Sequence, residues 1–260
     1  MKAIDLIKDL LGGEYPLENN PIDTIKEGDI EKEIKKVATC FIITPEVIRQ
    51  AHSWGADLII THEPTYYNHY DFKEDENPVV KAKSKLINET DIAIFRYHNF
   101  PHDNVRPDII HYGFVKTMGL EDCFNMVNNH ITLPKSTKPL EFANQIKEKL
   151  NLSNLRITGT TDKEIKEVWL VLGHPGPEYF HTFVNTDNID ALIIGEGQEW
   201  SDFEYVRDSV ELGYNKTLFI LGHCGAEFSG MRYLAEKLTN DYKQLEIKYF
   251  ESNEPFIYLN

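Results

Sequence analysis

Short apolar runs alternate with amphipathic stretches along most of this 260-residue chain. The apolar runs are rich in Val, Ile and Leu, as is typical of buried strands, and the amphipathic stretches have helical spacing. The sequence predicts strands at 37–43, 57–61, 92–96, 168–172, 191–194, 217–221 and 245–250, and helices at 45–54, 81–89, 107–118, 140–150, 202–212 and 231–238. This alternation predicts an α/β fold with a largely parallel sheet in each half of the chain.

Local signals place several of these boundaries. Thr44 and Pro45 are an N-cap residue and a proline at the first helical position, and Gly55 is expected to end that helix. We expect residues 125–165 to connect the two halves, and we place the division at their start. The predicted halves are an N-terminal one at 1–125 and a C-terminal one at 126–260.

Charge and cysteine content narrow the class of protein. The formal net charge of −15 argues against binding nucleic acid or an anionic membrane through a basic face. The three cysteines are an odd number without CxxC spacing, which disfavours a disulfide framework. No apolar run approaches the ~18 residues of a membrane span, and the N-terminus lacks the apolar core of a signal peptide. These features predict a soluble cytoplasmic protein.

Three predicted strands are followed by loops that carry a histidine, namely His62, His98 and His223. Each has a second potential ligand within four residues, and a fourth strand ends at Glu196. Ligands of α/β sheets gather at the carboxyl ends of strands. The candidate metal ligands are His62, Glu63, His98, His102, His223 and Glu227. This set exceeds one tetrahedral site, so it predicts two divalent ions that share a bridging carboxylate. Nitrogen and oxygen donors together favour Zn, Fe, Mn or Co.

The chain resembles the Nif-three-like family of dinuclear metal proteins, whose bacterial members are often labelled GTP cyclohydrolase I type 2 homologues. Four segments carry the resemblance: Ala51-His-Ser-Trp-Gly-Ala-Asp-Leu-Ile-Ile-Thr-His-Glu-Pro64, His98-Asn-Phe-Pro-His102, Ala191-Leu-Ile-Ile-Gly-Glu196 and Gly222-His-Cys-Gly-Ala-Glu227. The last segment is the most specific, because its spacing and the helix that follows both agree with the family.

The resemblance implies a role for each candidate residue. His62, His223 and Glu227 match metal ligands of the family, with Glu227 as the bridge, and His98 matches a histidine that often lies beside the metals. Glu63 replaces a second histidine, and His102 replaces an aspartate. In an alternative register Asp103 is the ligand instead of His102. The two replacements exchange a nitrogen and an oxygen donor, which indicates a variant subfamily that also lacks an extra central domain.

The resemblance further implies a Nif-three-like fold of two similar α/β halves packed face to face around a metal cleft, and a homohexamer built as a trimer of dimers. Two functions remain open. One is a metal-dependent hydrolase that attacks a small nucleotide-like or phosphorylated substrate with a metal-bridging hydroxide. Glu196 is then a general base or a group that supports a metal ligand. The other is a non-catalytic metal-binding or regulatory hexamer.

Overall fold

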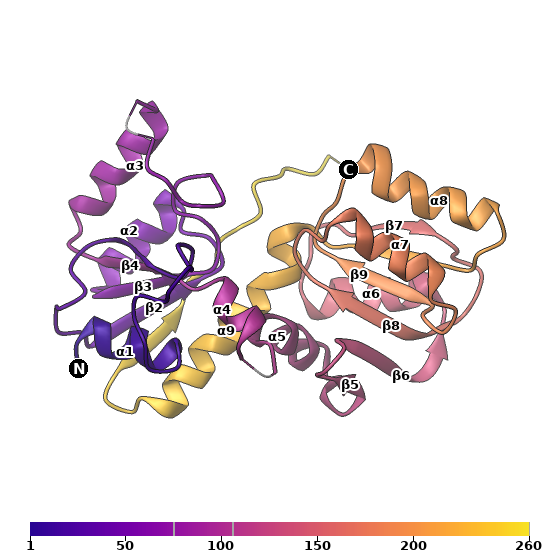
Figure 1. Ribbon diagram of the computed structural model, residues 1–260, viewed down its shortest axis with the longest axis horizontal. Helices are drawn as coiled ribbons and strands as arrows, with labels where there is room; N and C mark the ends of the chain where they lie inside the picture. Colours follow the sequence, from indigo (N-terminus) through magenta and orange to yellow (C-terminus); the bar gives the residue numbers. More distant parts are fainter. Residues whose placement is uncertain (75, 106, 260) are drawn as a thin grey trace. The chain divides into compact units, whose positions relative to one another are not determined.

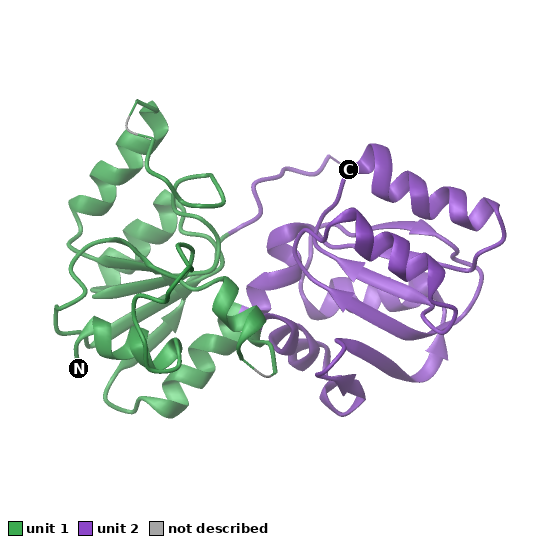
Figure 2. Cartoon of the chain, in the orientation of Figure 1, with its two compact units in different colours: residues 1–109, 231–252 green, residues 110–230, 253–260 purple. Residues whose placement is uncertain are grey.

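The structure is a computed structural model that describes residues 1–74, 76–105 and 107–259. Its chain divides into two compact units, shown in Figure 2. Unit 1 comprises residues 1–109 and 231–252, and unit 2 comprises residues 110–230 and 253–260. Each unit has its own sheet and its own core, so the two are described separately.

Unit 1 is built on a five-stranded sheet with the strand order β1-β4-β3-β2-β11. Its middle strands β2, β3 and β4 are labelled in Figure 1. Four strands are parallel, and β1 pairs with β4 in the antiparallel sense at one edge. The strands are β1 (Ile25–Glu27), β2 (Lys36–Cys40), β3 (Leu58–Thr61), β4 (Ala93–Arg96) and β11 (Glu246–Tyr249). The helices are α1 (Ala3–Leu10), α2 (Pro45–Trp54), α3 (Pro78–Asn88) and α4 (Asn99–Asp103).

Helix α2 has the predicted bounds because the capping signals act as expected. The Thr44 side chain accepts a hydrogen bond from the backbone N–H of Val47, 3.1 Å away. Gly55 adopts a left-handed φ of 84°, which a glycine takes without steric cost, and so it ends the helix. Because the helix ends at Trp54, the chain reaches the start of β3 at Leu58 after a short turn.

The core of unit 1 follows from the alternation of side chains along its strands. Ala38, Cys40, Ile59 and Ile94 face α2 and α3 in one hydrophobic cluster. On the opposite face of β2, the Thr39 hydroxyl donates to the backbone carbonyl of Met231, 3.0 Å away. The second part of α9, which begins at Met231, therefore packs on that face.

Unit 2 is built on a six-stranded mixed sheet with the strand order β5-β6-β8-β9-β10-β7. The central strands β8, β9 and β10 are parallel, and the strands outside them pair in the antiparallel sense. The strands are β5 (Phe124–Asn125), β6 (His130–Thr137), β7 (Arg156–Gly159), β8 (Ile165–Val171), β9 (Ala191–Ile194) and β10 (Thr217–Ile220). The helices are α5 (Ile109–Met118), a 3₁₀ turn (Glu121–Cys123), α6 (Pro139–Lys149), α7 (Pro177–Asn185), a π-helical segment (Glu199–Phe203), α8 (Glu204–Glu211) and α9 (His223–Asp241), which continues into unit 1.

Helices cover both faces of the central strands of unit 2. Leu218 and Ile220 on β10 belong to the hydrophobic cluster that includes Phe180 and Phe183 of α7. Phe219, which points to the opposite face, contacts Phe142 of α6 edge to face, with ring centroids 5.7 Å apart. Strands buried on both faces explain why β9 and β10 are continuous apolar runs in the sequence.

The structure confirms the α/β class and its two sheets, but the division of the chain and the strand directions in unit 2 differ from the sequence prediction. The prediction divided the chain between residues 125 and 126, whereas the units divide after residue 109, again after residue 230 and once more after residue 252. The second division arises because β11 pairs with β2 and so belongs to unit 1. The stretch 125–165, read as a connection, contains β6, α6 and β7, so the sheet of unit 2 is mixed rather than largely parallel.

Among the described residues, no helix is long and apolar enough to cross a membrane. The cytoplasmic location stays a prediction.

Candidate metal-binding clusters

The first candidate cluster lies at the carboxyl ends of two adjacent parallel strands of unit 1. Thr61 and Arg96 are register partners at the ends of β3 and β4. His62 and Glu63 follow β3 directly, and His98 follows β4 after one residue. Because these strands run side by side, their ends bring residues 35 positions apart in sequence into one place. The short helix α4 then carries His102 back over the same strand ends.

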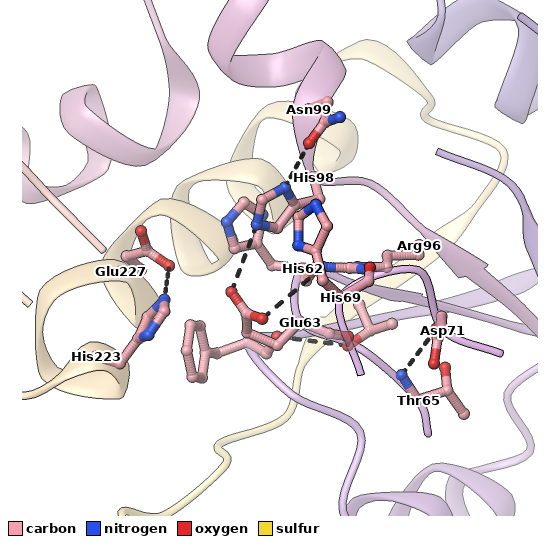
Figure 3. Close-up of polar contacts among 12 residues, drawn as sticks. His62, Glu63, Thr65, His69, Asp71, Arg96, His98, Asn99, His223 and Glu227 are labelled. Carbon is pink, nitrogen blue, oxygen red and sulfur yellow. Dashed lines mark hydrogen bonds and ion pairs between the residues drawn. The ribbon is translucent and has the colours of Figure 1, made fainter. Parts of the chain in front are cut away.

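The three histidine rings of this cluster contact one another (Figure 3 shows His62 and His98). The His62 ring is stacked on that of His98, with centroids 4.5 Å apart. It meets the His102 ring edge to face at 5.2 Å. His62 is fully buried, whereas His98 and His102 are partly exposed. The structure thus brings together the three histidines that the sequence proposed for this half of the chain.

All three rings are held through the same nitrogen, Nδ1, by hydrogen bonds. Nδ1 of His62 lies 3.0 Å from the carbonyl oxygen of Tyr97, Nδ1 of His102 lies 2.8 Å from a carboxylate oxygen of Asp108, and Nδ1 of His98 lies 2.8 Å from Oδ1 of Asn99. Oxygens of these kinds accept, so each Nδ1 carries the proton. A neutral ring protonated at Nδ1 keeps the lone pair on Nε2, and this is how partner groups prepare histidine for a metal.

Glu63 is the carboxylate of this cluster. Its Oε1 lies 3.6 Å from Nε2 of His98, and its Oε2 lies 3.9 Å from a terminal nitrogen of Arg96, as Figure 3 shows. Arg96 is fully buried and donates from Nε to the carbonyl of His62 at 3.0 Å. Burial lowers the pKa of Arg96, and the Glu63 carboxylate opposes that shift. A buried cation beside Glu63 favours its charged form, which is the form that binds a metal.

A buried aspartate fixes the segment that carries His98. Asp23 accepts from the backbone N–H of His98 at 2.6 Å and from that of Phe100 at 3.0 Å. Its side chain is fully buried, and these donors belong to the first turn of α4. Asp23 therefore acts as an anchor that holds both His98 and the helix bearing His102.

The structure distinguishes His102 from Asp103, the alternative metal ligand in this segment. The His102 ring contacts the rings of His62 and His98, whereas Asp103 is exposed at the end of α4. His102 is therefore the residue that the fold of unit 1 places in the cluster.

The second candidate cluster lies in unit 2, at the carboxyl ends of β9 and β10. Helix α9 begins at His223, earlier than the sequence predicted, so His223 and Glu227 lie one helical turn apart. Nε2 of His223 is 3.3 Å from Oε2 of Glu227, a contact drawn in Figure 3. Nδ1 of His223 is 3.0 Å from Oε1 of Glu196, which follows β9. Glu196 thus orients His223 in the way that Asp108 orients His102.

Gly173 shapes the wall of this second cluster. It follows β8 and has a left-handed φ of 85°. A Cβ atom at this position would lie 2.6 Å from Oε1 of Glu227, so only glycine leaves room for that carboxylate. Glu227 itself is almost completely buried.

Four further residues around the first cluster were not singled out from the sequence: Asp23, His69, Arg96 and Asp108. The His69 ring lies 5.9 Å from that of His98, edge to face, and burial lowers its pKa. Asp23 and Asp108 lie in loops, where an aspartate is common. Arg96 closes the apolar run of β4. Arginine is mostly an exposed residue, so its place at the end of a buried strand is the sequence signal that could have identified it.

The donor set fits a divalent ion. Ligand atoms of His62, Glu63 and His98 all lie within 4.8 Å of one another. Imidazole nitrogens with a carboxylate oxygen suit Zn, Fe, Mn or Co, as expected from the sequence. A mixed α/β protein with such clusters at its strand ends is, by class, a candidate metalloprotein.

Comparisons with known proteins identify the family of the chain. The family model Duf34/NIF3 (NGG1p interacting factor 3) matches residues 24–255, and the chain belongs to this family. A relative from Clostridium perfringens (strain 13 / Type A), called GTP cyclohydrolase 1 type 2 homolog, is 26% identical over an alignment of 245 residues. The match covers 89% of this chain and 89% of that protein.

Solved structures share the whole fold. Staphylococcus aureus hypothetical protein SA1388 matches with a TM-score of 0.78 at 19% identity, over 100% of this chain and 99% of that chain. A Bacillus cereus protein related to NIF3 matches with a TM-score of 0.75 at 15% identity, over 100% and 99% of the two chains. These matches confirm the Nif-three-like fold that the sequence predicted.

Proposed function

We propose that this protein binds two divalent metal ions and uses them to hydrolyse a small nucleotide-like or phosphorylated substrate. The observation that carries the metal part is that His62, His98 and His102 are each held through Nδ1, which leaves the lone pair of each ring on Nε2. Partner groups of this kind are typical of histidine ligands.

Each residue has a role in this proposal. His62, His98 and His102 supply nitrogen ligands in unit 1, and Glu63 supplies a carboxylate kept charged by Arg96. His223 and Glu227 supply the ligands of unit 2, and Glu196 holds the proton on Nδ1 of His223. A bound divalent ion would lower the pKa of a coordinated water and stabilise charge that develops on the substrate.

Metal content of variants tests the ligand assignment. We expect two ions per chain in the wild type. We expect a loss of metal in His62→Ala, His102→Ala, His223→Ala and Glu227→Ala. His52 is exposed on α2, so His52→Ala is the matched control and should keep full metal content. Unchanged metal in the four variants contradicts the ligand set, and one ion per chain contradicts the dinuclear part.

Turnover tests the hydrolase part separately. The relatives named GTP cyclohydrolase 1 type 2 homolog make GTP the first substrate to assay, followed by other nucleotides and phosphoesters. Activity should require added metal and should fall in Glu227→Ala but not in His52→Ala. Tight metal binding without turnover on this panel favours the second candidate, a non-catalytic metal-binding or regulatory protein. For either candidate we propose a homohexamer, which light scattering of the purified chain checks.

A further inference from the structure

Unit 2 contains a pocket of about 300 Å³ beside the carboxyl end of β10. Residues from four separate parts of the chain form it. They are Asn154, Leu155 and Arg156 at the start of β7, Glu199, the strand end Ile220-Leu221-Gly222, and Phe256 and Tyr258 of the C-terminal segment. β7 and β10 are antiparallel neighbours with Arg156 opposite Ile220, which brings the first and third parts together. A cavity of this size lies at the lower end of the range for small-molecule sites.

The lining of the pocket is partly apolar and partly aromatic. Ile220 and Leu221 are buried and supply apolar lining together with Leu155. The rings of Phe256 and Tyr258 lie 6.3 Å apart, and they are 66% and 38% exposed. The Tyr258 hydroxyl donates to a carboxylate oxygen of Glu254 at 3.2 Å. Aromatic faces that line a pocket and remain exposed are suited to stacking on a flat ring.

One ion pair supplies the polar part of the pocket. Arg156 contacts Glu199, and both side chains are about half exposed or more. The Arg156 guanidinium also lies over the Phe203 ring, 5.7 Å from its centroid. An exposed ion pair contributes only about 0–1 kcal/mol, so a ligand can replace either partner at low cost. Glu199 can only accept hydrogen bonds when ionised, and Arg156 can only donate them.

We propose that this pocket binds a planar aromatic heterocycle of nucleobase size that carries hydrogen-bond donors and acceptors along one edge. The ring stacks on Phe256 and Tyr258, its donors face Glu199, and its acceptors face Arg156. The charges of Arg156 and Glu199 offset each other in this pocket, so a neutral ring is the better match. This proposal goes beyond the metal-dependent function, since none of the pocket residues is a proposed metal ligand.

Binding of neutral nucleosides to the full chain tests the proposal, measured by titration calorimetry with and without a metal chelator. Guanosine offers adjacent N–H donors and a carbonyl acceptor on one edge and should bind. Adenosine lacks that donor pair and should bind at least tenfold more weakly. The chelator should leave guanosine binding unchanged, so failure of this site and failure of the metal sites are distinguishable.

Variants locate the site. A double variant, Phe256→Ala with Tyr258→Ala, should weaken guanosine binding at least tenfold, and Glu199→Gln should reduce the preference for guanosine over adenosine. Phe72→Ala removes an equally exposed aromatic ring from unit 1 and serves as the control for both. The altered side chains are exposed, so melting temperatures should stay near that of the wild type. Absence of nucleoside binding at millimolar concentration, or full binding by the double variant, would overturn the proposal.

Discussion

Replacement of Gly173 by alanine gives the sharpest test of how the fold builds the cluster in unit 2. The added methyl group would lie 2.6 Å from Oε1 of Glu227 and 3.7 Å from Nε2 of His223. The first distance is about 0.8 Å shorter than an ordinary contact between heavy atoms. Glu227 is almost completely buried, so it cannot swing into solvent to avoid the methyl group.

Two costs add in this variant. Alanine in the left-handed region costs roughly 1–2 kcal/mol, and overpacking of a buried group typically costs about 1–3 kcal/mol more. We therefore expect the free energy of unfolding to fall by about 2–5 kcal/mol in the metal-free protein. Metal affinity should fall as well, because metal–ligand distances tolerate changes of only about 0.2 Å.

Gly119→Ala separates the two costs. Gly119 lies in the same unit and has a similar φ of 72°, but no atom lies within 4 Å of the position that a Cβ would take. This control should lose only the backbone part, about 1–2 kcal/mol, and should bind metal as the wild type does.

Chemical denaturation of both variants in chelator measures stability, and competition with a chromogenic chelator measures metal affinity. An equal loss of stability in Gly173→Ala and Gly119→Ala, with unchanged metal affinity in both, would refute the reasoning. That outcome would mean that Glu227 does not need the space left by Gly173.

Three further predictions test unit 1. Asp23→Ala should lower the free energy of unfolding by about 2–4 kcal/mol, because two partly buried N–H groups lose their acceptor. Urea denaturation measures this change, and a loss of less than about 0.5 kcal/mol, as for a surface substitution, contradicts the anchoring role. Asp108→Asn should weaken metal binding about 10- to 100-fold in a chelator competition assay, since the carboxylate that orients His102 is lost; unchanged affinity excludes that role. Burial lowers the pKa of Lys83 from 10.5 to about 8. The native state therefore loses this proton at lower pH than the unfolded state, and the stability should rise between pH about 8 and about 10.5. Lys83→Met should lack that rise in urea titrations at the two pH values, and an identical rise in both proteins contradicts the assignment.

Much of unit 1 follows from local sequence. Thr44, Pro45 and Gly55 determine the bounds of α2, because capping and backbone conformation depend on neighbours in the chain. The buried strands β3 and β4 are read directly from their apolar runs. The sequence therefore places His62 and His98 correctly at strand ends, since parallel strands in α/β folds end at a common edge.

The sequence by itself determined the α/β class, the central strands and the list of candidate ligands, because these depend on local periodicity and short motifs. Only the tertiary structure decided that β11 joins unit 1, that α9 starts at His223, and that the Nδ1 atoms of His62 and His102 are held by Tyr97 and Asp108. Strand pairing and hydrogen bonds of this kind join residues through space. Their partners leave no periodic signal in the chain, so no local pattern could have named them.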